Sequence, residues 1–298
     1  MANHGTSTSL PRRQLGCYLR RGRIEANLTL EQVGAEMEWS ISKLGRIERG
    51  ETGKLTSRDI EALCDIIGFD PDTTAAMIGL NKQAAEKSWW HSFGDLIPEG
   101  FNVYVGLETS ATALDIYRPD VVPGLLQTAD YARALDRLYF PDDTDEESDR
   151  RVQLRHRRQK IITRKTNPTI LDVVLHESVL HTVVGTAEVM AAQLRHLAGI
   201  STRPNVSVRV LPFTAGLPVG TPTGPYIILD FITDRAGHTE PAVIYVENFT
   251  GDMYLEAETD LQRYRHASAT LHRAALDDVT SRTLLRQVAK YGGDRRWA

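Results

Sequence analysis

Apolar residues recur at helical spacing in the first third of the chain and form short aliphatic runs further on. This change of period predicts an all-α N-terminal helix-turn-helix domain followed by a mixed α/β (α+β) C-terminal domain. Helices are predicted at 11–26, in 28–50, and after Ser57 and Asp70. Strands bounded by Pro and Gly are predicted at 113–117, 169–175, 206–211, 226–231 and 242–246. Helices between and after them are predicted at 130–138, 149–163, 187–198, 258–275 and 278–290.

Residues 28–50, LTLEQVGAEMEWSISKLGRIERG, predict two short helices in close succession. Thr29 is a hydroxyl N-cap for the first helix, and Ser40 caps the second after a brief turn. Gly50 is placed to end the second helix. Helices joined by so brief a turn must cross steeply, and Gly34 supplies the small residue needed where they touch.

The second of these helices has one apolar face, formed by Leu44 and Ile47, and a free polar face. Ser, Lys and Arg on such a face reach phosphates and base edges in a major groove. An ordinary helical hairpin with a solvated basic face is the alternative, but the agreement of caps, small residue and glycine stop favours DNA binding. The candidate DNA contacts are Thr29, Ser40, Ile41, Ser42, Lys43, Arg46 and Arg49.

The runs LTLEQVGAEM and WSISKLGRIERG resemble the helix-turn-helix of the Xre/Cro repressor class, over residues 12–70. The resemblance implies that Glu48 pairs with an arginine of the first helix, Arg23. Two residues depart from the pattern of that class. Glu38 stands at a turn position that is usually glycine, and Gly45 weakens the recognition helix by about 1 kcal/mol relative to alanine.

A second resemblance covers nearly the whole chain and is to actinobacterial regulators of the WhiJ type. It implies an antitoxin-like or developmental regulator with a C-terminal domain of uncharacterised function, often encoded beside a small acidic partner protein. The segments that carry it are Trp89-Trp90, YVGLE at 104–108, VPGLLQTADYARAL at 122–135, RPNVSVRVLPF at 203–213 and AVIYVENFTGDMYLE at 242–256.

The charge of this 298-residue chain is divided unevenly along its length. Residues 1–58 hold ten Lys plus Arg and six Asp plus Glu, a net charge of +4. Because the whole chain has a net charge of −4, residues 59–298 carry −4 minus +4, or −8. A basic N-terminal part on an acidic body suits a site-specific DNA reader, since phosphate contacts must then be local.

The cellular compartment is predicted from the two cysteines and from the length of the apolar segments. Cys17 and Cys64 lie in apolar helical patterns and are expected to be buried in a reducing cytosol. No stretch has the apolar length needed to cross a bilayer, and the start MANHGTSTSL has no basic segment followed by an apolar one. A cytoplasmic protein that does not enter a membrane is expected.

Two features of the C-terminal domain have competing interpretations. The run PGLLQTADYA is a turn leading into a helix, and it is either a structural lock or part of a pocket for a ligand or partner that includes Gln127, Tyr131 and the loop at 216–224. The adjacent Trp89 and Trp90 cannot both point into one helix core, so one of them is expected to dock on the second domain and form a hinge.

A third feature is the block PDDTDEESD followed by RRVQLRHRRQK. Acidic residues before a helix and basic residues along it complement the helix dipole, so a solvated helix is the first interpretation. A second DNA contact, or a docking face for an acidic partner, is the alternative.

The sequence holds no catalytic motif. No HExxH zinc clamp and no GxSxG elbow appear, and neither a P-loop nor a GxGxxG run follows any predicted strand. His176 and His181 lack the i, i+4 spacing of a zinc clamp. We therefore expect a protein that is not an enzyme, with no catalytic residues, no cofactor and no metal site.

These observations predict a sequence-specific DNA-binding transcriptional regulator that recognises a double-stranded operator. We expect a homodimer, with the apolar patterns at 261–271 and 279–288 as dimer surfaces, and a C-terminal domain that responds to a small protein partner or a small-molecule ligand. The alternative is an antitoxin-like protein whose body neutralises a partner and whose DNA binding serves autoregulation. The expected domains are a disordered tail at 1–10, the helix-turn-helix domain at 11–70, a helical connector at 71–90 and the effector domain at 91–298.

Overall fold

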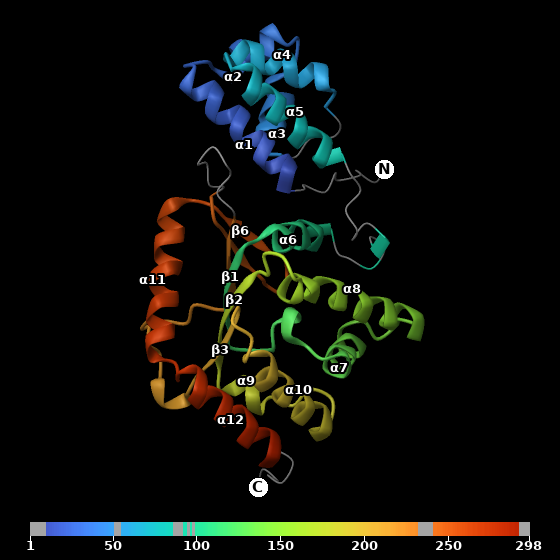
Figure 1. The fold of residues 1–298 in the computed structure, drawn as a ribbon, viewed down its shortest axis with the longest axis vertical. Coiled ribbons are helices and arrows are strands. Elements are labelled where there is room, and N and C mark those ends of the chain that lie inside the picture. Colours follow the sequence, from blue (N-terminus) through green and yellow to red (C-terminus); the bar gives the residue numbers. More distant parts are fainter. Residues whose placement is uncertain are drawn as a thin grey trace. The chain divides into compact units, whose positions relative to one another are not determined.

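The chain folds into two compact units, residues 1–110 and 111–298, in a computed structural model. The structure describes residues 10–50, 55–85, 92–93, 96, 99–231 and 241–291. The first unit is helical and the second combines a sheet with helices, so the predicted fold class is confirmed (Figure 1). The predicted hinge residues Trp89 and Trp90 lie outside the described residues.

The first unit packs its first five helices around a small apolar core that includes Leu19, Val33, Leu44 and Leu63, each 1% exposed or less. Thr56 and Gly68 bound the fourth helix, one as a hydroxyl N-cap and the other as a left-handed C-cap. The described helices are α1 (Leu10–Glu25), α2 (Leu30–Glu36), α3 (Ile41–Glu48), α4 (Ser57–Ile67), α5 (Pro71–Ala85) and α6 (Glu99–Ser110).

The buried face of α1 differs from the prediction. Cys17 is exposed, although it was expected to be buried like Cys64, which is buried, and Ile24 is 54% exposed. Two glycines take the inward positions instead. A Cβ on Gly16 would lie 2.5 Å from the carbonyl oxygen of Ile47, and one on Gly22 would clash with the ring of Phe69. A hydrophobicity pattern misses this face because glycine has no side chain.

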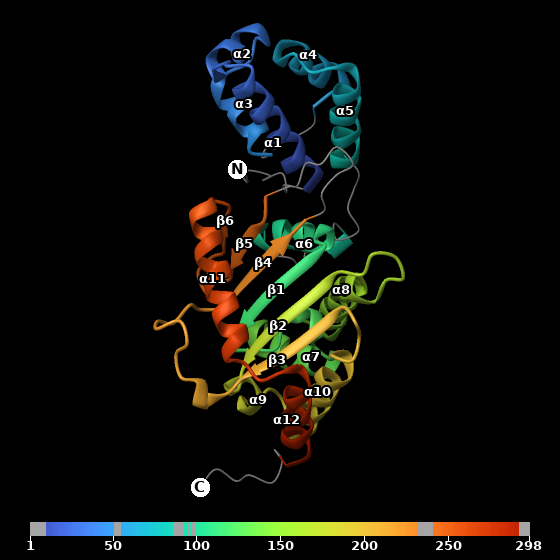
Figure 2. The same ribbon diagram turned by 60° about the vertical axis from the view of Figure 1, so that its left-hand side comes forward.

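The second unit is built on a six-stranded mixed sheet with the strand order β3-β2-β1-β4-β5-β6 (Figure 2). Strands β1, β2 and β3 are parallel, whereas β4, β5 and β6 pair antiparallel in succession. The last strand was not predicted, since it has only three residues. The strands are β1 (Ala113–Arg118), β2 (Ile170–His176), β3 (Val206–Leu211), β4 (Tyr226–Asp230), β5 (Val243–Val246) and β6 (Met253–Leu255).

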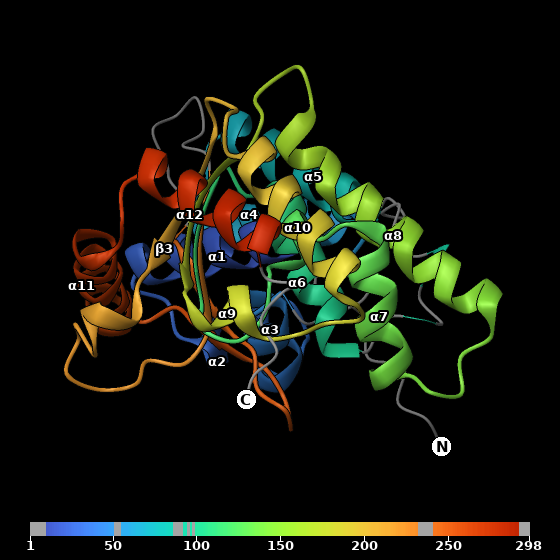
Figure 3. The same ribbon diagram turned by 90° about the horizontal axis from the view of Figure 1, so that it is seen from below.

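Helices cover both faces of this sheet (Figure 3). On one face lies α11 (Glu258–Ala274), and on the other lie α7 (Ala129–Tyr139), α8 (Asp145–Thr163) and α10 (Ala187–Ile200). The last helix, α12 (Asp278–Tyr291), packs on α10 and beside β3. The short helices are η2 (Gly124–Leu126), α9 (Ser178–His181) and η3 (Phe213–Ala215).

Most of the apolar side chains proposed as dimer surfaces are buried within the second unit itself, although Val279 of α12 is 66% exposed. Leu261 and Leu271 of α11 are 8% and 3% exposed and pack against the sheet with residues such as Ile228. Leu285 of α12 is fully buried. The apolar spacing of these two helices therefore reports the domain's own core, which corrects the sequence-based assignment of a dimer surface.

The charge pattern of α8 had suggested a solvated helix, but the structure shows that several of its residues are buried. Val152, Leu154, Ile161 and Ile162 are buried along it, and Thr144 caps its start in a capping box. Two of its arginines form ion pairs inside the domain, Arg151 with Asp143 and Arg155 with Asp136.

Candidate nucleic-acid interface

A buried ion pair holds α3 against α1. Arg23 donates from Nε to Glu48 Oε1 at 2.6 Å and from Nη2 to Oε2 at 2.8 Å, and its third nitrogen donates to the carbonyl of Leu28. The two side chains are 11% and 6% exposed. The hydrogen bonds to Glu48 raise the pKa of Arg23 above its ordinary value. The structure thus brings together the two residues that the resemblance paired, and the pair fixes the inner side of α3.

Side-chain caps set where the two helices begin. Thr29 accepts from the backbone N–H of Gln32, whose side chain accepts in return from the N–H of Thr29, a complete capping box. Ser40 accepts from the N–H of Lys43 at 3.2 Å. Both hydroxyls satisfy helix-terminal amides, which explains why hydroxyl residues stand here whether or not they also touch DNA.

The turn between α2 and α3 is tight enough to constrain two positions. A Cβ on Gly34 would lie 2.9 Å from the carbonyl oxygen of Trp39, so the expected need for a small residue here is confirmed. Glu38 has a φ of 54°, in the left-handed region that favours glycine. This conformation accounts for glycine at the equivalent position of the class that the segment resembles.

The outward face of α3 is polar and accessible. Ile41 is 48% exposed at the first turn, and Ser42, Arg46 and Arg49 are exposed. Lys43 is half-buried, because its Nζ lies 3.5 Å from the centre of the Trp39 ring. A cation held over an aromatic face keeps its charge while losing rotamer freedom. The helix therefore presents hydroxyls, one aliphatic side chain and guanidinium groups in one place.

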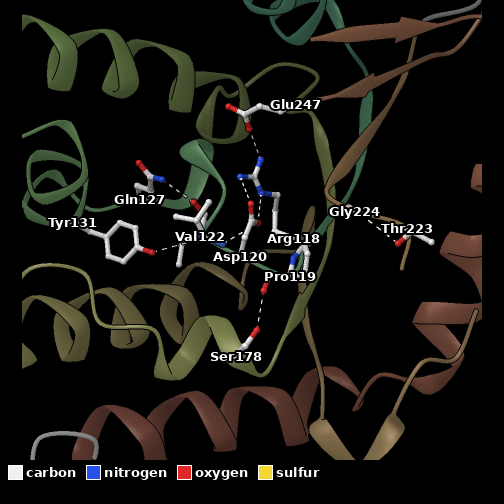
Figure 4. A network of polar contacts seen from close by, with 11 residues as sticks. Arg118, Pro119, Asp120, Val122, Gln127, Tyr131, Ser178, Thr223, Gly224 and Glu247 are labelled. Carbon is white, nitrogen blue, oxygen red and sulfur yellow. Dashed lines mark hydrogen bonds and ion pairs between the residues drawn. The ribbon is translucent and has the colours of Figure 1, made fainter. Parts of the chain in front are cut away.

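In the second unit, Gln127 and Tyr131 both contact Val122 (Figure 4). Gln127 donates to the carbonyl of Val122 at 2.7 Å, and the hydroxyl of Tyr131 accepts from its N–H at 3.4 Å. Gln127 is 7% and Tyr131 1% exposed, and burial raises the pKa of Tyr131. These contacts fit the structural-lock interpretation of the PGLLQTADYA run, and a role in ligand binding stays a prediction.

Two further glutamines brace the same turn from neighbouring helices. Gln159 of α8 donates to the carbonyl of Gln127 at 2.8 Å. Gln193 of α10, fully buried, accepts from the N–H of Thr128 at 2.7 Å and donates to the carbonyl of Leu126 at 2.8 Å. Neither residue was singled out from the sequence, because a buried glutamine inside a helical pattern has no distinguishing period.

A charged cluster at the carboxyl end of β1 was also missed. Arg118 donates to both carboxylate oxygens of Asp120, at 2.9 and 3.1 Å, and to Glu247 at 2.6 Å (Figure 4). Burial lowers the pKa of Arg118, but the two carboxylates outweigh burial and the net shift is upward. Both carboxylates remain about half exposed. The available signal was the charge directly after two predicted strands, yet only the strand register shows that the charges meet.

Among the described residues, no three His, Cys, Asp or Glu side chains gather in a way that could hold a metal ion. None of the helices in the described ranges combines the length and the apolar character that a membrane span requires.

Comparison with known proteins identifies both units. A helix-turn-helix domain model matches residues 14–77, and a model described as a domain of unknown function, DUF5753, matches residues 101–287. Two crystal structures of the clp gene regulator ClgR from Corynebacterium glutamicum are each 22% identical with a TM-score of 0.22. They cover 27% and 30% of this chain, and the chain covers 99% and 92% of theirs. No curated protein matches the chain.

The helix-turn-helix match and the locked, polar α3 define the class: a DNA-binding transcriptional regulator with a helix-turn-helix domain. The second match covers more than half of the residues, and the chain belongs to the family that carries the domain of unknown function DUF5753.

Proposed function

We propose that α3 is the recognition helix of this regulator and reads an operator through Ser40, Ile41, Ser42, Lys43 and Arg46, with Thr29 and Arg49 at the backbone. The observation that carries the proposal is the asymmetry of α3. Its inner face is fixed by Leu44, Ile47 and the Glu48 ion pair, whereas its outer face is accessible and bears no acidic side chain. Hydroxyl and guanidinium groups on such a face match base edges and phosphates in a major groove.

The test begins with duplexes selected from random sequence by the full-length protein. Arg46→Ala should weaken binding to the selected duplex by about 1–3 kcal/mol if the guanidinium reads a base. Arg58→Ala, which removes an exposed arginine from α4, is the matched control and should leave affinity close to that of the wild type. Unchanged binding by the Arg46 variant would overturn the assignment.

A second measurement separates base reading from general attraction. The exposed side chain of Ile41 suits a thymine methyl group, so Ile41→Asn should change the base preference at one position of the selected sequence. A variant that selects the same sequence as the wild type would contradict this role.

We further propose that the protein binds its operator as a homodimer and that the second unit modulates this binding when a small protein partner or ligand occupies it. The Arg118 cluster supports the idea, because half-exposed carboxylates lie around a buried guanidinium at the carboxyl end of β1. Ligands of open α/β sheets bind at the carboxyl ends of strands.

The test of this modulation is biochemical. Molecules that copurify with the protein from its native host under non-denaturing conditions are identified by mass spectrometry and added back to the purified chain. Coupling of about 1–3 kcal/mol corresponds to a five- to hundredfold change in operator affinity, and Arg118→Ala should abolish that change. Equal operator affinity with and without the added molecule would remove it as an effector.

A further inference from the structure

The second half of α8 and the loop after it form a positively charged segment in an acidic part of the chain. Residues 150–171 hold eight Lys plus Arg and no Asp or Glu, whereas residues 59–298 carry a net charge of −8. Four of these cations are exposed and define the basic strip, namely Arg157, Lys160, Arg164 and Lys165. The strip is separate from the recognition helix and from the Arg118 cluster.

Three other arginines of α8 make contacts within the second unit. Arg155 donates to both oxygens of Asp136, which is 4% exposed, Arg151 pairs with Asp143, and Arg158 is buried beside Gly124. The side chains of the basic strip are instead exposed to solvent. Lys160 and Lys165 form no ion pair within the described part of the chain, so their charges are not used inside the domain.

Helical spacing places two members of the strip on one face. Arg157 and Lys160 are three residues apart within α8, so their side chains follow one another along the helix surface. Arg164, by contrast, is the C-cap residue, and Lys165 comes directly after it. The Arg164 guanidinium donates to the carbonyl of Asn167 at 2.7 Å, which keeps it near the helix end. Complementing the helix dipole would require cations in the last turn only, because that effect falls off within one turn. Arg157 lies well before the last turn.

We propose that the basic strip contacts the phosphate backbone of the DNA that the helix-turn-helix domain binds. This inference rests on the proposed function of α3. A duplex is the anionic polymer that the first unit brings to the chain, and a tethered second contact acts at a high effective concentration, so even weak phosphate contacts add affinity. The rest of the second unit, residues 111–149 and 172–298, holds fifteen Lys plus Arg and 24 Asp plus Glu, a net charge of −9, which disfavours contact with DNA outside the strip.

The experiment measures how affinity for the selected duplex depends on salt, using the full-length protein. Each lost phosphate contact makes the negative slope of log K against log salt shallower by about 0.9, so the slope of the double variant Lys160→Ala/Lys165→Ala should be less negative by about two. At 0.1 M salt its affinity should fall by a factor on the order of tenfold or more. The matched control is Arg263→Ala/Arg286→Ala, which removes two exposed cations from α11 and α12.

Hydroxyl-radical footprints add a readout that a folding defect would not mimic. The Lys160/Lys165 variant should lose protection at some phosphates while the bases read by α3 stay protected. A slope and footprint equal to those of the wild type would overturn this inference and leave the proposed function of α3 intact. A wild-type protein that selects no duplex would instead overturn the proposed function, and this inference with it.

Discussion

Two arginines on α1 show how burial decides the value of an ion pair. Arg21 pairs with Glu25 while both side chains are more than 60% exposed, whereas Arg23 pairs with Glu48 at 11% and 6% exposure. An exposed pair contributes about 0–1 kcal/mol, but removing one partner of a buried pair leaves an uncompensated charge. The same residue type, two positions apart, therefore has different consequences for the fold.

We expect Arg23→Ala to lower the free energy of unfolding of the first unit by about 3–5 kcal/mol, and Arg21→Ala by less than about 1 kcal/mol. Hydrogen exchange of the α3 amides in the full chain measures the stability of the first unit separately from that of the second. Similar protection factors in the two variants would contradict the structural role of the Glu48 pair, since both variants lose one arginine from the same helix.

A histidine of the second unit should make stability depend on pH. His272 of α11 lies 3.5 Å from Asp115 and 3.7 Å from Asp172, and the hydrogen bond to Asp115 leads the causes that raise its pKa. Arg209 on β3 opposes the shift, and Ser268 donates to the same Asp115 carboxylate. Charged His272 therefore ties α11 to β1 and β2.

The sign of this pH dependence follows from the direction of the shift. Because the folded pKa of His272 is raised above 6.5, its stabilisation is complete below pH 6.5 and is lost as pH rises through the folded value. Denaturant unfolding should show wild-type stability falling over that window, and His272→Gln should lack this component. NMR titration of the His272 ring should give a lower midpoint in Asp115→Asn, and an unchanged midpoint would contradict the contact.

At the scale of elements, the turn between α2 and α3 contains stored strain. Glu38 adopts a φ of 54° that glycine adopts without steric cost. We expect Glu38→Gly to leave the free energy of unfolding unchanged or to raise it by up to about 1 kcal/mol. Glycine relieves the backbone strain of the folded state, and this gain is at least as large as the loss from the greater conformational entropy of the unfolded chain. The control Glu36→Gly, inside α2, should cost about 0.5–1 kcal/mol. A lower melting temperature for Glu38→Gly than for Glu36→Gly in thermal unfolding would contradict backbone strain at Glu38.

The contact of α1 with α3 depends on a glycine. A Cβ on Gly16 would meet backbone atoms of Ile47 and Glu48 at 2.5 to 2.9 Å, whereas one on Gly79, within α5, would meet nothing within 4 Å. Gly16→Ala should therefore push the helices apart and destabilise the first unit by several kcal/mol, and Gly79→Ala should stabilise it by about 0.5–1 kcal/mol. Calorimetry of the two variants measures both signs, and stabilisation by Gly16→Ala would contradict the close approach.

Helices, strands and caps could be predicted from the sequence where the residues of one short segment determine its structure. The strand at 206–211 was predicted with the bounds observed, and the caps Thr29 and Ser40 and the small residue Gly34 followed from local chemistry. Contacts between distant positions were not predictable. Arg118 meets Glu247 across 129 residues, and Gln193 meets Thr128 across 65, because strand register and helix docking bring them together. Within the candidate interface, the sequence identified the polar face of α3 but not the stacking of Lys43 on Trp39.

At the scale of the whole molecule, the second unit uses its apolar residues internally. The sheet is covered by α11 on one face and by α7, α8 and α10 on the other. Leu271 is 3% exposed, so Leu271→Asp should unfold the second unit rather than separate two intact copies. Circular dichroism that shows native helix content in a monomeric variant would contradict this.

DNA binding itself should require two copies of the chain. A single helix-turn-helix unit places one short helix in the groove, and single modules bury only about 600–1,000 Å² of protein surface. Two first units placed about 34 Å apart, one turn of DNA, would double that interface and read a palindromic site. We therefore expect the selected duplex to contain two related half-sites, and a titration should end at two chains per duplex. A duplex with one half-site replaced by random sequence is the control and should bind far more weakly. Saturation at one chain per duplex, with a monomer by light scattering at micromolar concentration, would rule out the homodimer.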